Sequence, residues 1–307
     1  MIALLFVVVA VMRVIQVCCN KGSSNLVDKG EKFFHYGAFY QLISALFGLI
    51  SVFVVGFHGF DWFTIVLSLI SALLFAVELF ASLEAIRGGS LLLCNMFSTG
   101  GSIFIPCIFG MIFFGDKMTY WHWIGLVIFV ASVYFIASNS EKEHKPLTLK
   151  TLLMLVLGMV SNGAIMIVQD YFAERGENVF MFSFLTFAFN AAILAVCFFA
   201  MVLFFRKKNE EGRVSRKIEL LPKKLYAFGA LLALALFTIS NLVTTLNKTY
   251  PPVVVFPVSS TISLIITAVV GAVAFQEKIT WKKAVGIVLG IASVVVINMD
   301  GILKLLF

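Results

Sequence analysis

The chain has 307 residues, of which 61% are hydrophobic and 13% are charged, and its mean hydropathy is +1.03. This composition leaves too little polar surface to cover a water-soluble particle, so it excludes an ordinary soluble domain and predicts a membrane protein. The formal net charge of +7 does not indicate nucleic-acid binding, because the basic stretches lack interleaved aromatic residues and any recognisable binding module.

Ten apolar runs, separated by charged residues, glycine or proline, predict membrane-spanning helices. A hydrocarbon core of about 30 Å requires about 20 apolar residues in a helix, whereas barrel strands would alternate over about ten residues. We expect the first run to be retained rather than cleaved, because Arg13 lies inside it and no small-residue cleavage site follows. The predicted spans are 1–19, 33–57, 62–86, 90–114, 120–137, 151–171, 179–205, 225–246, 253–275 and 284–298.

Cysteine and histidine residues do not predict a metal site, a disulfide or a cofactor. The cysteines lie in or beside apolar runs without C-x-x-C spacing, so we interpret them as small buried hydrophobic residues. The histidines lie near the ends of runs without metal-binding spacing. We therefore predict that the protein binds no metal and no cofactor.

The second half of the chain repeats a pattern of the first half at an offset of 161 positions. Apolar residues match easily by chance in lipid-facing helices, but a lysine, a threonine and glycines in one frame do not. We interpret the match as an internal repeat. The aligned pairs include Lys117 with Lys278, Thr119 with Thr280, Gly125 with Gly286, and the A-S-V triplets at 131–133 and 292–294.

Each copy of the repeat contains five predicted spans. Because five is an odd number, the second copy must enter the membrane from the opposite side, which is the inverted-repeat architecture of many secondary transporters. We predict an all-α membrane protein with ten transmembrane helices as two inverted five-helix repeats. The repeats are expected at 1–138 and 151–307, joined by a cytoplasmic linker at 139–150.

The repeated segments at 98–137 and 259–298 resemble the drug/metabolite transporter superfamily, specifically its ten-helix EamA-type members. The resemblance rests on an apolar helix with an internal polar or proline position, a [GQ]-[DE]-K-x-T corner, and a following helix with an A-S-V triplet. The closing pattern is also similar to the small multidrug transporters, which carry one four-helix copy and dimerise. The resemblance implies transport of a small solute through a cavity lined by helices 1, 3, 4, 6, 8 and 9.

Basic residues are concentrated in the loops on one side of the predicted bundle. Loops after odd-numbered spans hold 18 of the 23 lysines and arginines, and loops on the other side hold four. Because cytoplasmic loops are enriched in basic residues, we predict that both termini lie outside a cell membrane. This orientation is opposite to the usual EamA-type arrangement, in which both termini face the cytoplasm.

Two ionisable residues, Arg13 and Glu78, lie inside predicted spans. Charges in hydrocarbon are costly and mark candidate functional sites. At 1.5 Å per residue, each lies roughly 10 to 12 Å from the basic end of its span, so we expect them at one depth. They form either a structural ion pair, or a site in which Arg13 binds a carboxylate or Glu78 takes a proton. Glu84, beside Arg87, is interpreted as an ordinary interfacial charge.

Polar residues three, four or seven positions apart form stripes on the six spans that the resemblance places around the cavity. We predict that these stripes bind the substrate. The alternative is that their side chains only bond their own backbone or hold helices together. The predicted substrate-binding residues are Arg13, Gln16, Glu78, Asn95, Ser98, Thr99, Ser102, Asn162, Gln169, Asn241, Ser259, Ser260 and Ser263.

Proline and glycine mark two further features of the predicted spans. Pro106 and Pro257 each remove a helical hydrogen bond, which suits gating beside a cavity and equally suits a static bend. Gly286 and Gly290 form a G-x-x-x-G face for close helix contact. We interpret this face as packing between the repeats and expect a monomer.

The leading hypothesis is a secondary active transporter that moves a small metabolite or drug by alternating access. The chain has no Walker A sequence, and its acidic and histidine residues are not clustered as an intramembrane enzyme would require. Small multidrug transporters carry a glutamate where this chain has Arg13, which favours amino-acid-like anionic or zwitterionic cargo. A proton or an exchanged solute would supply the coupling. The alternatives are a multidrug or organic-cation exporter, and a receptor that binds without flux.

Overall fold

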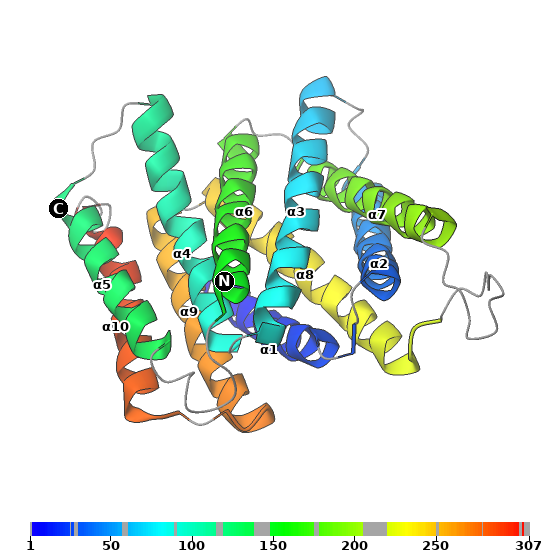
Figure 1. Cartoon of the computed structure of the whole chain (residues 1–307). Coiled ribbons are helices and arrows are strands. Elements are labelled where there is room, and N and C mark those ends of the chain that lie inside the picture. The colour runs from blue at the N-terminus through cyan, green and yellow to red at the C-terminus, as the bar shows by residue number, and fades with distance from the viewer. Residues whose placement is uncertain are drawn as a thin grey trace.

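The computed structural model shows a bundle of helices (Figure 1). The residues that it describes include ten α-helices, together with a π-helical turn at Gly110–Phe114, and they contain no strand. The described residues are 2–24, 26–27, 30–56, 61–88, 91–114, 119–137, 148–174, 178–204, 220–249, 252–277, 279–300 and 303.

The helices lie where the apolar runs predicted them, with small differences at their ends. Helix α1 continues beyond the expected residue 19, so Lys21 lies in its last turn rather than in a loop. The bounds are α1 Ile2–Ser24, α2 Glu31–Val55, α3 Trp62–Gly88, α4 Leu91–Phe109, α5 Tyr120–Ala137, α6 Leu149–Glu174, α7 Val179–Phe204, α8 Lys223–Thr249, α9 Pro252–Ala274 and α10 Trp281–Ile297.

Eight of these helices are long and apolar enough to cross a membrane. They run from α1 to α8, which confirms a multi-pass helical membrane protein. In α9, the stretch assessed for a span is the shorter Val258–Ala274, and α10 has 17 residues. A full crossing by α9 and α10 therefore stays a prediction.

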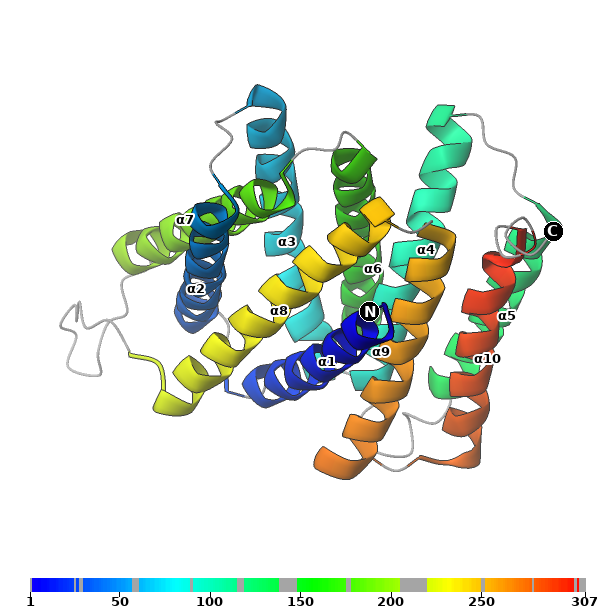
Figure 2. The same ribbon diagram turned by 180° about the vertical axis from the view of Figure 1, so that it is seen from behind.

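Six helices form the centre of the bundle in two layers. Helices α3, α6 and α4 lie side by side in one layer (Figure 1), and α8, α1 and α9 lie side by side in the other (Figure 2). Helices α2 and α7 pack together at one end, and α5 and α10 at the other. The six central helices are those that the resemblance placed around a cavity. Each central helix corresponds to the one five places along the chain, and the two members of each pair lie in different layers: α1 with α6, α3 with α8, and α4 with α9.

The α5–α10 pair has contacts that occur twice. Ser132 on α5 donates to the carbonyl of Gly286, and Ser293 on α10 donates to the carbonyl of Gly125. Partners in the two bonds are 161 positions apart, as in the repeat frame. A Cβ on Gly286 would lie 2.5 Å from Ile136, and one on Gly125 would lie 2.2 Å from Ile297, again 161 positions apart. The predicted glycine face therefore packs inside the chain.

A second pair of hydrogen bonds has its acceptors, but not its donors, in the same frame. Asn190 on α7 donates to the carbonyl of Ala72 on α3 at 2.8 Å, and Ser44 on α2 donates to the carbonyl of Ala233 on α8 at 3.4 Å. The two acceptors are 161 positions apart. Both donors are fully buried, so these bonds satisfy polar groups that have no water nearby.

The threonine of the repeated corner has a structural role at the start of a helix. Thr280 has the extended conformation of an N-cap, and its hydroxyl accepts from the backbone N–H of Lys283 at 3.4 Å. Thr119 precedes α5 in the same way, and its hydroxyl contacts His122 Nδ1 at 2.7 Å and donates to Asp300. The motif therefore begins a helix in each half. Lys117 and Lys278 lie outside the described residues.

Pro106 lies inside α4, and the π-helical turn at Gly110–Phe114 follows it. A proline cannot donate to the preceding turn, so the helix has a local weakness where its hydrogen-bond pattern changes. The helix α9 is continuous through position 257, and the side chain of Pro257 lies outside the described residues. Gating by either proline stays a prediction.

The backbones of α4 and α6 touch at glycines. A Cβ on Gly101 would lie 2.0 Å from the carbonyl oxygen of Met159, and a Cβ on Gly163 would lie 2.4 Å from that of Gly101. Gly158, also on α6, is different, because a Cβ there would meet its nearest atom, in Ala81, at 3.6 Å.

We expect Gly101→Ala to destabilise the protein by about 1–3 kcal/mol, because the methyl group would push two backbones apart. The matched variant Gly158→Ala should be neutral or slightly stabilising, since it gains helix propensity without a clash. Thermal unfolding in detergent would measure both. Equal stability of the two variants would contradict the close α4–α6 contact.

Candidate functional site

Arg13 lies in the middle of α1 and makes one hydrogen bond through its guanidinium. Its Nη1 donates to Gln16 Oε1, one turn along the same helix, at 2.8 Å. Its Nε is buried and has no hydrogen-bond partner. A buried donor without a partner is unusual in proteins, and inside a membrane helix it indicates a group available to a ligand.

Glu78 on α3 is the other charge inside a predicted span, and it is half-buried. Its Oε1 accepts from Ser82 Oγ at 2.7 Å, one turn along α3. Arg13 and Glu78 interact electrostatically, but among the described residues the ion pairs within 4.0 Å do not include this one. The two charges therefore lie near each other without a direct contact.

Three polar residues near this part of α3 were not among the predicted site residues. Cys94 on α4 contacts the carbonyl of Ser82, the residue that binds Glu78, and on α2 Gln41 donates to the hydroxyl of Tyr40 at 3.2 Å. Tyr40 and Gln41 are buried, and Gln41 Oε1 has no hydrogen-bond partner. A tyrosine and a glutamine in the middle of the apolar run 33–57 were the available signal.

The predicted residues of α4 bond to α9 in the other layer and to α6 in the same layer. Asn95 Nδ2 donates to the carbonyl of Ser263 on α9 at 3.1 Å, and Ser263 Oγ donates back to Asn95 Oδ1 at 3.2 Å. Asn162 on α6 donates to the carbonyl of Ser98 at 2.7 Å. These amides connect helices in the structure, which is the alternative role considered for the polar stripes.

Several other predicted residues bond their own helix or a neighbouring helix. Ser102 donates to the carbonyl of Thr99 at 2.7 Å, within α4. On α8, Asn241 accepts from Ser183 of α7 at 3.1 Å and donates to the carbonyl of Phe237. Gln169 on α6 donates to Ser240 at 3.3 Å. On α9, Ser259 is buried and Ser260 is half-buried.

A small pocket lies between α3, α4 and α6. Ser82 contributes to its wall, so the cavity is one hydrogen bond away from the Glu78 carboxylate. Cys94 also lines it and contacts the carbonyl of Ser82. Its remaining lining residues are Ala85, Ser98, Met154, Leu155, Gly158 and Met159.

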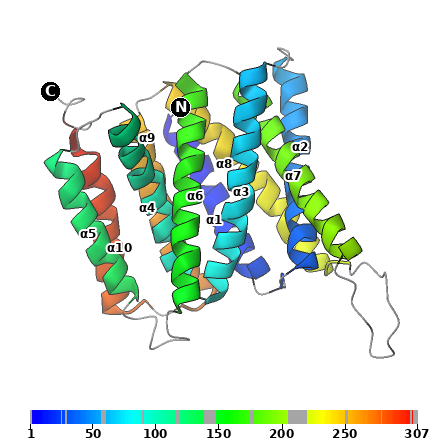
Figure 3. The same ribbon diagram turned by 45° about the horizontal axis from the view of Figure 1, so that its top comes forward.

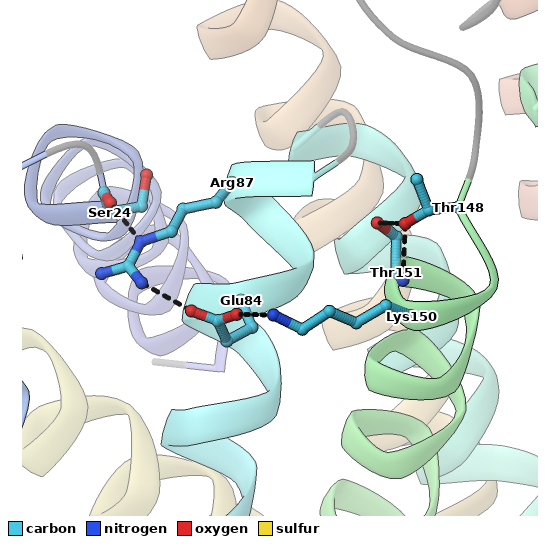
Figure 4. A network of polar contacts seen from close by, with 6 residues as sticks. All are labelled: Ser24, Glu84, Arg87, Thr148, Lys150 and Thr151. Atoms are coloured by element: carbon cyan, nitrogen blue, oxygen red, sulfur yellow. Dashed lines mark hydrogen bonds and ion pairs between the residues drawn. The ribbon is translucent and has the colours of Figure 1, made fainter. Parts of the chain in front are cut away.

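Glu84 was interpreted as an ordinary interfacial charge, and in the structure it belongs to an ion-pair network at the end of α3. Its carboxylate is buried and accepts from Arg87 Nη1 at 2.6 Å and from Lys150 Nζ of α6 at 2.7 Å (Figure 4). Arg87 Nε also donates to the carbonyl of Ser24 on α1 at 2.7 Å. The carboxylate is buried because α1 and α6 pack over the end of α3.

A second ion pair joins α1 to the segment before α10. Lys21 Nζ lies 3.5 Å from Glu277 Oε1. Lys283 was counted as a loop residue, but it is a buried residue of α10 and lines a pocket with Glu277.

Figure 3 places the ends of α1, α3, α5, α7 and α9 on one side of the bundle, drawn as the lower side. Both ion pairs lie on this side, which is the basic side.

Among the described residues, no three His, Cys, Asp or Glu side chains gather to hold a metal ion. The five cysteines are free thiols. The polar chemistry of the site consists of one guanidinium, one carboxylate, amides and hydroxyls. Such groups bind and orient a polar solute.

Residues 149–299 match the EamA-like transporter family, and this range coincides with α6 to α10. The second half of the chain is an EamA-like transporter domain. This match suggests membrane transport of small solutes. The match confirms the resemblance that the repeated corner indicated. No curated protein matches the chain.

A solved structure titled only "Crystal structure of protein" is similar in fold over nearly the whole length. The TM-score is 0.63 at 13% sequence identity, and the alignment covers 97% of each chain. At this identity the likeness shows the fold alone. The shared fold includes the first half of the chain as well as the second.

We expect Arg13→Gln and Glu78→Gln each to lower thermal stability in detergent, because each leaves the other charge without its counter-charge. The double variant should lose less than the sum of the single losses, with a coupling of about 0.5–3 kcal/mol. The exposed pair Lys224→Gln and Glu174→Gln is the matched control and should be additive. Additive losses for Arg13 and Glu78 would show that their charges do not interact.

Proposed function

We propose that the protein is a secondary active transporter that moves a small polar solute across a membrane by alternating access. The observation that carries this proposal is a half-buried arginine and a half-buried carboxylate in the middle of spanning helices, each bonded to a neighbour on its own helix and not to the other, in a chain whose second half matches the EamA-like family. Lipid offers no partner to such groups, so their retention is expected where a solute uses them. Arg13 and Glu78 are the proposed centre of the site.

The proposed architecture is two inverted repeats, at 1–138 and 151–307, joined by a linker at 139–150. It is supported by the reciprocal bonds Ser132 to Gly286 and Ser293 to Gly125, because only a two-fold relation makes two contacts of a helix pair equivalent in both directions. In an experimental structure, 1–137 should superpose on 151–298 by about half a turn around an axis in the membrane plane. Superposition about the membrane normal would refute this architecture.

The proposed motion opens one side of the central helices while closing the other. On the basic side, Glu84–Lys150 joins α3 to α6 and Lys21–Glu277 joins α1 to the segment before α10. Each pair joins one of the first five helices to the part of the chain that begins with α6. They hold this side closed, and release of a solute there requires them to separate.

Flux measurement distinguishes this function from its alternatives. Protein in vesicles should exchange a labelled solute from a panel of amino acids, organic anions and organic cations, and Arg13→Gln should abolish or greatly reduce that exchange. Lys224→Gln should not change it. Binding without flux would indicate a receptor, and exchange limited to organic cations would favour an organic-cation exporter.

We expect the basic side to face the cytoplasm. A cysteine at Lys282, exposed at the start of α10 on the basic side, should react with an impermeant maleimide only after cells are opened. Its matched control is a cysteine at Tyr120, which is 87% exposed at the start of α5 on the other side and should react in intact cells. The reverse labelling pattern would give the opposite orientation.

We expect Glu84→Gln to loosen the closed basic side, because Lys150 and Arg87 lose a charged acceptor. A cysteine at Ser98, which lines the cavity, should then react about tenfold faster with a maleimide added from the basic side. Glu174→Gln, exposed at the far end of α6, is the control and should leave the rate unchanged. An unchanged rate in Glu84→Gln would refute the proposal that these ion pairs hold the basic side closed.

A further inference from the structure

Glu84 has a basic partner on its own helix in addition to the lysine that it bonds across the bundle. Its carboxylate accepts from Lys150 of α6 at 2.7 Å and from Arg87, one turn along α3, at 2.6 Å (Figure 4). If α6 moves away from α3 as the basic side opens, Arg87 stays with the carboxylate, because both residues belong to α3. The carboxylate therefore does not become an isolated buried charge, which would be costly.

Glu277 has a corresponding arrangement with two lysines. Lys21 Nζ of α1 lies 3.5 Å from Glu277 Oε1. Lys283, in the first turn of α10, lines a small pocket between α4, α9 and α10 together with Glu277, and it is only 3% exposed. One lysine thus reaches Glu277 from α1, whereas the other follows it in the same part of the chain.

The backbone between α9 and α10 turns the Glu277 carboxylate back onto α9. The N–H of Glu277 donates to the carbonyl of Gly271 at 2.9 Å, and a Cβ on Gly271 would lie 3.5 Å from Glu277 Oε2. Gln276, the preceding residue, has a φ of 53°, in the left-handed region that is costly for a residue other than glycine. This turn holds Glu277 against the end of α9, so the carboxylate moves with α9 and α10 and not with α1.

We propose that Lys283 is a positioning residue that takes over the Glu277 carboxylate when Lys21 withdraws. With the basic side closed, Glu277 pairs with Lys21. As this side opens, the carboxylate turns toward Lys283 within the pocket that both residues line. This inference rests on the proposed transport function, because it describes how one of its closing contacts is released.

The exchange of partners lowers the cost of opening. Without a second cation, withdrawal of Lys21 would leave the Glu277 carboxylate, which is 19% exposed, without compensation. With Lys283 beside the same pocket, opening replaces one ion pair by another, so the two states of the segment stay close in free energy. The two lysines should therefore act in opposite directions, Lys21 favouring the closed state and Lys283 the open state.

The first test measures how fast the basic side opens. A cysteine at Ser98, which lines the pocket between α3, α4 and α6, reports opening by its rate of reaction with a maleimide added from the basic side. Lys21→Gln should raise this rate about tenfold, and Lys283→Met, which removes the charge but keeps a long side chain, should lower it about tenfold. Glu174→Gln, exposed at the far end of α6, is the control and should leave the rate unchanged.

A charge-keeping variant separates this role from simple packing. Lys283→Arg should react at a rate close to that of the unmodified protein, because the cation that receives Glu277 is still present. Rates that change in the same direction in Lys21→Gln and Lys283→Met would overturn the proposal. So would a rate in Lys283→Arg as low as that in Lys283→Met.

The second test uses thermal unfolding in detergent and requires no transport. Lys21→Gln and Lys283→Met each leave Glu277 one cation, so together they should lower Tm by more than the sum of their single effects. In the Glu277→Gln background the same two changes should be additive, because no carboxylate remains for the lysines to share. Additive losses with Glu277 in place would overturn the proposal.

A simpler comparison decides the matter if Lys283→Met does not fold. Lys21→Gln should lower Tm less than Glu277→Gln does, because the first change leaves Glu277 with Lys283, whereas the second removes the carboxylate from both lysines. An equal or larger loss in Lys21→Gln would overturn the proposal.

The failure of this inference differs from the failure of the proposed function. Non-additive losses of Tm without flux of any solute would support the role of Lys283 and overturn transport. Flux together with additive losses of Tm would overturn the role of Lys283 and leave transport standing.

Discussion

Polar groups inside the hydrocarbon must find partners within the protein, and this constraint organises the whole bundle. The buried side chains of Asn190, Ser44 and Ser68 each donate to a backbone carbonyl of a different helix. Asn95 and Asn162 do the same from α4 and α6. Because water cannot substitute for these bonds, each one fixes the contact between two helices. Some buried side-chain atoms of the described residues, among them Arg13 Nε and Asn190 Oδ1, have no such partner.

The central helices α4 and α6 touch at one level of the bundle and separate at another. Close backbone contact at Gly101 and Gly163 leaves no room between α4 and α6 at that level. Nearer the basic side, the same two helices and α3 separate enough to leave the cavity beside Ser82. Close backbone contact and a small pocket thus alternate along one helix pair.

Much of the fold could be predicted from the sequence, because the length and hydropathy of a spanning helix are local properties. The ends of α5 agree with the expected range, and the six central helices are those that the resemblance indicated. The environment of Glu84 and Lys283 could not be predicted in this way. Both look like charges at the ends of spans, and only the packing of neighbouring helices determines that they are buried.

The candidate site shows the same limit. Arg13 and Glu78 stand out in sequence because charges are rare in apolar runs, whereas Tyr40 and Gln41 belong to a helix expected outside the cavity lining. Whether two charges touch or stay apart depends on side-chain neighbours such as Gln16 and Ser82. No spacing rule contains this information, because the helices involved are joined only in three dimensions.

The reciprocal contacts of α5 and α10 have a consequence for how the molecule assembles. Two-fold contacts of this kind are typical of dimers, whose association weakens on dilution. Within a single chain, the two partners stay at an effective concentration that the connecting segment sets. The amount of protein that a cell makes therefore does not affect the pairing of the two halves, and each molecule carries its own partner from the moment it is synthesised.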